Sequence, residues 1–484
     1  PPLPRRLPMA SPALRALLAL CLLGSSVALA LTPPTRAVAR PSLSSRAQPL
    51  LSASAGPSSE RESPKGAAVL PSVVNLAKNI VGSGVLALAA GVAAVSSNRL
   101  ALLPAIVLTL VLGAISGYTF SLIARVGVDV GAQTYYEAWA KAVSERSSIL
   151  VSGAITFMTC AACLSYAIII GDSFSSIATL AGAPALFCRP NPWIILMSVV
   201  VLFPLSLLRD LSALAFGSVV GNAGTLFTAM FTLFRLADGS YAPGGKFHTA
   251  IAEAARPKLN PTAPIISPGI FVLISMLSTA YVAHYNAPRF YEELAPNKDG
   301  SSKLPKFNKV VAGGFGLAAF FCASVMSGGF LTFGSAAKGL ILNNYATTDR
   351  LALISRVGIG ASIVFAYPIN FYALRSGIFG LLKLEKLAHR TDVHIGSTIA
   401  LMLAFNGLAL KVKDLGLVVA VGGAVLGSLI VYILPALMYL FNMRRKTKAG
   451  LTLSPMQKRE VLGNKLLVVV GFLLGGLGVY TCLK

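Results

Sequence analysis

Long apolar stretches, separated by short polar segments, follow one another from residue 71 to residue 482. A transmembrane helix needs about 20 apolar residues to cross roughly 30 Å of hydrocarbon, and a sliding window of about 19 residues locates such stretches. The pattern predicts spans at residues 71–95, 100–124, 149–171, 193–208, 212–235, 267–288, 308–334, 351–373, 394–411, 416–441 and 464–482. We therefore expect an all-α polytopic membrane protein with about eleven transmembrane helices.

The composition agrees with a membrane protein. Hydrophobic residues make up 55% and charged residues 12% of the 484 residues, whereas a soluble domain carries about 25% charged residues. The formal net charge of +24 would favour a nucleic-acid partner in a soluble protein. Here the Lys and Arg residues lie in the loops and in the N-terminal tail, so the expected partner is the lipid bilayer and not nucleic acid.

The Lys and Arg residues are shared unevenly between the two sets of loops. If the first span begins on the inner side of the membrane, the loops on that side hold about twice as many as the loops on the other side. The excess is heaviest in residues 289–309, 375–390 and 444–459. The positive-inside rule therefore favours this orientation.

Residues 1–68 have the composition of a targeting leader, so the transmembrane domain is expected at residues 69–484. Residues from about 9 to 30 resemble a signal peptide, because a short apolar run is followed by a small-residue cleavage site at Ala30. Residues 31–68 are rich in Arg and Ser and almost without acidic residues, as in a transit peptide. The two parts together favour the plastid envelope. The alternative is a disordered tail behind a secretory signal, with a vacuolar, other endomembrane or plasma-membrane location.

Two predicted spans carry polar residues and glycines that a simple membrane anchor would not need. The first contains Lys78, Asn79 and the run Gly82-Ser83-Gly84. The sixth contains Ser275, Ser278, Thr279 and His284 ahead of Pro288. Broken, polar-rich helices five spans apart are typical of inverted-repeat transporters, whose substrate site lies near the middle of the bilayer.

Ordered blocks of sequence between Ser72 and Tyr439 resemble the amino acid and auxin permease family. They include SVVNLAKNIVGSGVLAL at 72–88, with a G-x-G break, YVAHYNAPRFYEEL at 281–294 and YPINFYALRSGIF at 367–379. The branches that the chain resembles most are the sodium-coupled neutral amino acid transporters and the plant vacuolar amino acid transporters. The resemblance implies a LeuT-type (APC) fold, with two inverted five-helix repeats and one extra helix. It also implies a secondary active transporter of amino acids, expected to be neutral, that works by alternating access.

The helix breaks supply the groups that a zwitterionic amino acid needs. Unwinding at Gly82, Ser83 and Gly84 would expose backbone N–H groups to the carboxylate. Carbonyl groups around Ser275, Ser278 and Thr279 would receive the ammonium group. Tyr166 and Tyr281 are candidate walls of the binding pocket. The alternative is that the glycines only allow close helix packing and that the tyrosines only fill the interior.

Lys78 is the residue that most affects the expected coupling. It lies four residues before Gly82 and therefore on the same helical face. By the resemblance, sodium-coupled members carry at this position an Asn that helps to hold sodium. The partner stretch in the eighth span reads Val364-Phe365-Ala366, so it offers no side-chain oxygen before Tyr367.

An ammonium group at the position of Lys78 would occupy the place of the cation. We therefore expect sodium-independent transport, either coupled to protons through Lys78 or uncoupled. Asn79, Ala366 and Asn370 complete the candidate cation site. The alternative is that Lys78 reaches the inner interface and acts only as an anchor.

Asp172, His284 and Tyr367 are candidates for gates or proton relays. Asp172 stands at the predicted end of the third span, as an outer gate or as a helix-end residue. His284 would relay protons in the sixth span, or would be a hydrogen-bonded packing residue. Tyr367 would be a gate, and the alternative is ordinary aromatic packing.

Enzymatic activity is not expected from this sequence. The four His residues are dispersed and no pair of carboxylates recurs at helical spacing, so we expect no catalytic site, cofactor or metal site. A non-transporting amino acid sensor, a channel, and a carrier of another small organic solute such as auxin are the alternatives that the sequence leaves open.

Overall fold

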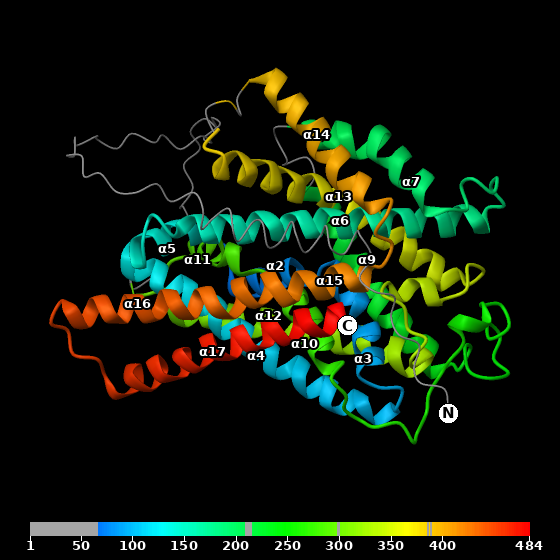
Figure 1. The fold of residues 1–484 in the computed structure, drawn as a ribbon, viewed down its shortest axis with the longest axis horizontal. Helices are drawn as coiled ribbons and strands as arrows, with labels where there is room; N and C mark the ends of the chain where they lie inside the picture. Colours follow the sequence, from blue (N-terminus) through cyan, green and yellow to red (C-terminus); the bar gives the residue numbers. More distant parts are fainter. Residues whose placement is uncertain (1–65, 209–214, 298–300, 385–386, 388–389) are drawn as a thin grey trace, which may run out of the picture.

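The computed structural model describes residues 66–208, 215–297, 301–384, 387 and 390–484, without the side chains of residues 215–220 and 222 (Figure 1). Residues 1–65 of the predicted leader lie outside the described residues. In the described part, helices are joined by loops with two isolated β-bridges. The expectation of an all-α protein is confirmed.

The helices follow the predicted spans in order. The first five spans are α2 (Val69–Ile80) with η1 (Ser83–Ala87) and α3 (Leu88–Val95), α4 (Leu102–Val130), α6 (Ser148–Leu180), α7 (Pro190–Met197) with η3 (Ser198–Leu202) and α8 (Phe203–Leu207), and α9 (Ala215–Ala237). The next five are α10 (Ile270–Ala280) with η6 (His284–Asn286) and α11 (Ala287–Glu293), α12 (Leu304–Phe333), α13 (Arg350–Leu381), α14 (Thr391–Ala409), and α15 (Leu415–Gly422) with η9 (Gly423–Ile433) and α16 (Leu434–Lys448). The last span is α17 (Pro455–Leu483). Four further short helices lie between spans in the described part of the chain: η2 (Arg99–Ala101), α5 (Tyr135–Ala142), η5 (Glu253–Ala255) and η7 (Ile341–Asn344).

Among the described residues, nine helices are long and apolar enough to cross a membrane. The two halves of the first span meet at an angle of 53°. Counted together as one span, they bring the number in the described residues to ten. The predicted fifth span coincides with α9, of which Ala223–Ala237 qualifies as a shorter apolar helix. Each predicted span therefore has a helical counterpart.

Successive spans run in opposite directions, which defines two faces of the bundle. We call the face on which α2 begins the inner face and the opposite one the outer face. The connection with α5 and the end of α16 lie on the inner face, at the left of Figure 1, whereas the loop 238–269 lies on the outer face at the right. The site described below lies between these two faces.

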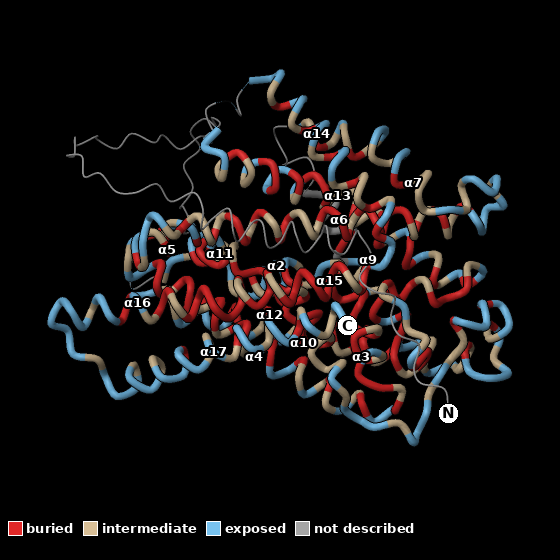
Figure 2. The backbone as a smooth tube through the Cα atoms, viewed as in Figure 1, coloured by how far each residue is buried: buried red, intermediate tan, exposed pale blue. Residues whose placement is uncertain are grey.

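Burial separates the interior helices from the peripheral ones (Figure 2). In the α15–α16 span 83% of the most apolar window is buried, against 22% in the span that begins with α7, 28% in α14 and 11% in α17. The peripheral helices expose large apolar side chains such as Leu403 and Leu462. Such side chains suit lipid, because lipid tails are as apolar as leucine.

A single carboxylate ties the peripheral helix α17 to the bundle near the inner face. Glu460 accepts two hydrogen bonds from the Arg125 guanidinium of α4, at 2.6 and 3.0 Å. It also accepts from the Tyr118 hydroxyl of α4 at 3.0 Å and from the Tyr439 hydroxyl of α16 at 2.6 Å. Glu460 therefore joins three helices.

Replacing Glu460 by alanine should destabilise the protein by about 2–4 kcal/mol, because a guanidinium and two hydroxyls lose their acceptor together. Thermal unfolding of the purified protein in detergent measures the effect. Arg289→Ala is the matched control, since it removes an exposed ion pair with Glu293 that should contribute about 1 kcal/mol or less. Equal shifts for the two variants would contradict the role of Glu460.

Candidate functional site

The two broken spans meet at their breaks. α2 ends at Ile80, Gly82 is extended, and the chain becomes helical again at Ser83. In the sixth span α10 ends at Ala280 and the chain is helical again from His284. A Cβ atom on Gly84 would lie 3.2 Å from the Ala280 Cα. The breaks are therefore in direct backbone contact, and a side chain at position 84 would require the Ala280 backbone to shift.

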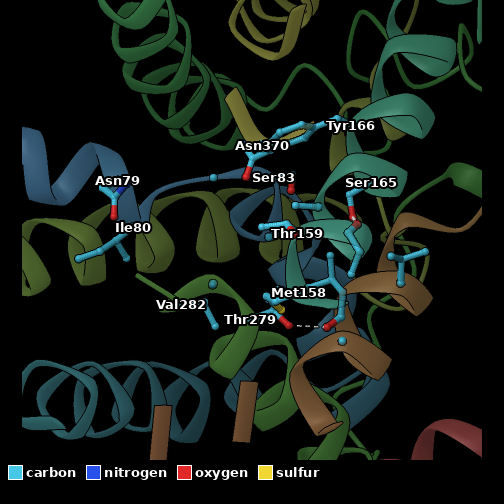
Figure 3. Close-up of a pocket in the computed structure, with 18 of the residues that line it drawn as sticks. Asn79, Ile80, Ser83, Met158, Thr159, Ser165, Tyr166, Thr279, Val282 and Asn370 are labelled. Atoms are coloured by element: carbon cyan, nitrogen blue, oxygen red, sulfur yellow. Dashed lines mark hydrogen bonds between the residues drawn. The ribbon is translucent and has the colours of Figure 1, made fainter. Parts of the chain in front are cut away.

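A cavity of about 90 Å³ lies beside the two breaks (Figure 3). Residues of α2, η1, α6, α10, η6, α13, α15 and the connection after α10 line it. Its polar side chains are those of Asn79, Ser83, Thr159, Ser165, Thr279 and Asn370, with the rings of Tyr166 and Tyr285. Among the described lining residues there is no Asp, Glu, Lys, Arg or His. Polarity in this cavity therefore comes from neutral groups and from the backbone.

The backbone at the breaks offers donors on one wall and acceptors on another. The first N–H groups of a helical segment have no partner within the helix, and neither do its last carbonyls. Ser83 and Gly84 are such first residues and both line the cavity. Thr279 and Ala280 are the last residues of α10 and line it as well. The Thr279 carbonyl accepts from the Val282 N–H at 3.2 Å and keeps a second lone pair for a further donor. A ligand with a carboxylate and an ammonium group matches this arrangement.

The structure places the eight predicted substrate residues in two groups. Gly82, Ser83, Gly84, Tyr166 and Thr279 line the cavity. Ser275, Ser278 and Tyr281 do not belong to its lining.

The hydrogen bonds of the second group explain this difference. The Ser275 hydroxyl donates to the Phe271 carbonyl at 2.8 Å, and the Ser278 hydroxyl donates to the Ile274 carbonyl at 2.9 Å. Such bonds to the preceding turn are compatible with a continuous helix, and α10 breaks only after Ala280. The Tyr281 hydroxyl donates to the Thr109 carbonyl of α4 at 2.9 Å, so it is directed into the protein interior.

The residues of the candidate cation site lie near the inner half of the first span. Asn79 and Asn370 line the cavity, and Asn370 donates to the Ala366 carbonyl at 3.2 Å. Lys78 is half-buried in the last turn of α2 and precedes the lining residue Asn79, but it does not belong to the lining. No carboxylate among the described residues lies within ion-pair distance of its ammonium group.

The three candidate gate or relay residues lie outside the lining of the cavity. Asp172 accepts a hydrogen bond of 2.7 Å from the Asn343 amide of η7. Since α6 continues to Leu180, Asp172 is within the helix and not at its end. Tyr367 is buried and donates to the Asn406 side-chain oxygen of α14 at 2.8 Å. His284 is fully buried and faces α4.

The cavity is exposed toward the inner face and covered toward the outer face. Asn79 and Gly82 are exposed, whereas Val418 and Val419 of α15 are only 1% and 2% exposed. On the outer side, Asn343 in the loop between α12 and α13 is bonded to α6. The exposed side of the cavity is therefore the one beside the inner half of α2.

The loop that covers the outer side is itself held in place. Gly339 lies directly against Asp414 and Gly416 at the start of α15. The buried Arg356 guanidinium donates to the carbonyls of Leu342 and Tyr345, at 2.9 and 2.7 Å. The outer cover is thus fixed by several polar contacts.

Asp349, at the end of the loop between α12 and α13, anchors the segment that follows α9. Asp349 pairs with Arg235 at 2.6 Å and accepts from the Tyr241 hydroxyl at 2.9 Å. Burial, together with the nearby Asp349 carboxylate, raises the pKa of Tyr241 well above its usual value. Tyr241 therefore remains a hydrogen-bond donor at all physiological pH values.

Sequence reasoning missed most of the α6 wall, of which it named only Tyr166, and the whole α15 wall. Met158, Thr159, Ala162 and Ser165 come from α6, and their spacing along one helical face was the available signal. Val418, Val419 and Gly422 come from α15. Their apolar run resembles any buried helix, so the sequence carried no signal for them.

The fold defines the class of protein. It resembles the crystal structure of MhsT in complex with L-phenylalanine, with a TM-score of 0.50 and 15% identity over 86% of this chain and 100% of that chain. The chain is thus an integral, multi-pass membrane protein of the LeuT-type fold. A family model described as "Transmembrane amino acid transporter protein" matches residues 65–483, and the chain belongs to that family.

Curated relatives are similar over most of their length. Vacuolar amino acid transporter 5 of Schizosaccharomyces pombe is 24% identical over 394 residues, 80% of this chain and 87% of that protein. Vacuolar amino acid transporter 2 of Saccharomyces cerevisiae is 23% identical over 389 residues, 78% of this chain and 76% of that protein. Putative sodium-coupled neutral amino acid transporter 11 of Danio rerio is 24% identical over 371 residues, 76% of this chain and 77% of that protein. The family resemblance and the expectation of no enzymatic activity are confirmed.

Proposed function

We propose that this protein is a secondary active transporter that moves neutral amino acids by alternating access. The observation that carries the proposal is the contact between the two helix breaks at Gly84 and Ala280, beside a cavity without charged lining side chains. An amino acid would place its carboxylate at the N–H groups of Ser83 and Gly84 and its ammonium group at the end of α10. A charged side chain on the substrate would find no counter-ion among the lining residues of the cavity, which favours neutral amino acids.

The conformation described here corresponds to an inward-accessible state of the transport cycle. Its cavity is exposed at Asn79 and Gly82, and it is covered on the outer side by α15 and by the Asp172–Asn343 contact. Opening the outer side would require that contact to break. Asp172 is therefore proposed to act in the outer gate.

We propose that transport is independent of sodium. Lys78 lies in the last turn of α2, where a cation is stabilised by the negative end of the helix dipole. Its ammonium group would repel a second cation nearby. In α13 the Ala366 carbonyl is already used by Asn370, which supports the same conclusion.

We propose the plastid envelope as the location of the protein, with a vacuolar or other endomembrane as the alternative. The relatives named as vacuolar amino acid transporters support an endomembrane, whereas the composition of residues 1–68 favours the plastid envelope. Microscopy of the chain with a C-terminal fluorescent tag, with and without residues 1–68, distinguishes the two. A plastid location lost on truncation supports the leader, and an unchanged endomembrane location contradicts it.

Competition binding tests the proposed mode of recognition. Purified protein should bind labelled neutral L-amino acids, and unlabelled L-amino acids should compete. The methyl ester and the N-acetyl derivative of the same amino acid should compete at least about tenfold less well, because each loses one charged end. Equal competition by the blocked derivatives would show that the helix ends do not recognise the substrate backbone.

A further inference from the structure

His284 occupies an unusual position in the break of the sixth span. It is the first residue of η6, and its side chain is fully buried. Its neighbours in sequence include Val282 and Tyr285, which line the cavity, whereas its own ring is directed at α4. The short segment between α10 and α11 thus touches the cavity on one side and α4 on the other.

The hydrogen bonds of His284 determine which ring nitrogen carries the hydrogen. Nε2 lies 3.1 Å from the Ser116 carbonyl oxygen, which can only accept. It also lies 2.9 Å from the Thr119 hydroxyl, which itself donates to a backbone carbonyl of α4. We therefore assign Nε2 as the donor, so that in the neutral ring Nδ1 carries the lone pair. Nδ1 has no hydrogen-bond partner among the described residues.

The surroundings of His284 supply neither a charge nor an acceptor for a second ring hydrogen. The rings of Phe120 and Phe315 lie 5.9 and 6.3 Å away. The charged residues on the elements packed around it are Arg125, Asp129, Glu137, Lys141, Arg289, Glu292, Glu293, Lys306 and Lys309, and no hydrogen bond or ion pair joins any of them to the imidazole. The other titratable groups on and around these elements are phenols and a thiol, namely Tyr118, Tyr135, Tyr136, Tyr281, Tyr285, Tyr291, Tyr432 and Cys322.

We propose that His284 Nδ1 binds the proton that is transported together with the amino acid. A proton on Nδ1 would turn the neutral ring into an imidazolium whose new N–H has no acceptor in the described conformation. A buried charge without a partner is costly. The inward-accessible conformation therefore favours the neutral ring, and the conformation that keeps the proton must reposition η6 against α4.

This coupling gives a direction, and it rests on the proposed transport function. Since Val282 and Tyr285 line the cavity on either side of His284 in the sequence, the proton and the substrate would act on the same segment. The proton and the amino acid would both bind from the outer side. Both would leave on the inner side, because the inward-accessible state has a neutral His284. His284 thus makes the protein a proton symporter directed toward its inner face.

Uptake into sodium-free proteoliposomes tests the proposal. A mixture of labelled neutral L-amino acids is supplied with and without an inward proton gradient, and a pH-sensitive dye inside the vesicles records proton movement. Wild type should accumulate amino acid only with the gradient and acidify the lumen. His284→Gln keeps an N–H donor for the Ser116 carbonyl but cannot take up a proton. Its gradient-driven accumulation should fall at least about tenfold, while exchange of labelled for unlabelled amino acid persists.

Two controls keep the outcomes distinct. His248→Gln, in the outer loop, should behave like wild type, and His284→Asn replaces the Gln variant if that variant does not fold. Proton-driven accumulation by a folded His284 variant, or wild-type transport without proton movement, would overturn the inference and leave the transport function standing. Absence of exchange in wild type would instead remove the proposed function itself.

Discussion

Replacing Gly84 by valine should reduce amino acid uptake at least about tenfold, because overpacking costs about 1–3 kcal/mol where the neighbours cannot move. A Cβ at this position would lie 3.2 Å from the Ala280 Cα and 3.4 Å from its backbone nitrogen. A backbone cannot rotate away as a flexible side chain can, so the two breaks would separate. Initial uptake rates in proteoliposomes, normalised to the amount of folded protein, measure the effect.

Gly82→Ala is the matched control for this substitution. Gly82 lies two residues earlier in the same break, but nothing lies within 4 Å of the position its Cβ would take. Its φ of −111° is open to any residue. We therefore expect Gly82→Ala to keep most of the uptake. Equal losses in the two variants would mean that contact between the breaks is not what the site requires.

Replacing Lys78 by asparagine should lower sodium-free uptake at least about tenfold, because a fixed positive charge beside the end of α2 is lost. If the ammonium group stands in for a bound cation, sodium should restore part of the uptake of this variant. Uptake with sodium chloride and with choline chloride compares the two conditions.

Lys309→Asn is the control for Lys78→Asn, because Lys309 is exposed at the inner end of α12. It should transport like wild type in both salts. Sodium-free uptake that is unchanged in Lys78→Asn would show that Lys78 only anchors the inner half of the first span.

The spans and the first break were predictable because they depend on local sequence. Each span needs its own apolar stretch, since the bilayer satisfies no backbone group. The break in the first span follows from Gly82 and Gly84, which have little helical preference. The helices therefore appear where the apolar pattern places them.

The sixth span shows the limit of local reasoning. Its hydroxyl residues suggested a break around Ser275 to Thr279, yet Ser275 and Ser278 bond to their own preceding turn and the helix continues to Ala280. A hydroxyl can either line a site or bond to its own helix, and the sequence does not distinguish the two.

Contacts between distant segments were the least predictable part of the site. The Asp172 carboxylate meets Asn343 from a loop 171 positions away along the chain. Val418 and Val419 reach the cavity only because α15 packs against α6 and α10. Such contacts are set by the packing of the whole bundle and leave no local pattern.

Uptake of labelled neutral L-amino acids by the purified wild-type protein in sodium-free proteoliposomes tests the central claim most directly. The proposed function predicts saturable uptake that unlabelled neutral amino acids inhibit and that Gly84→Val lowers at least about tenfold. Binding of the same amino acids to folded protein without any uptake or exchange would contradict it, and would favour a sensor that keeps the site but does not transport.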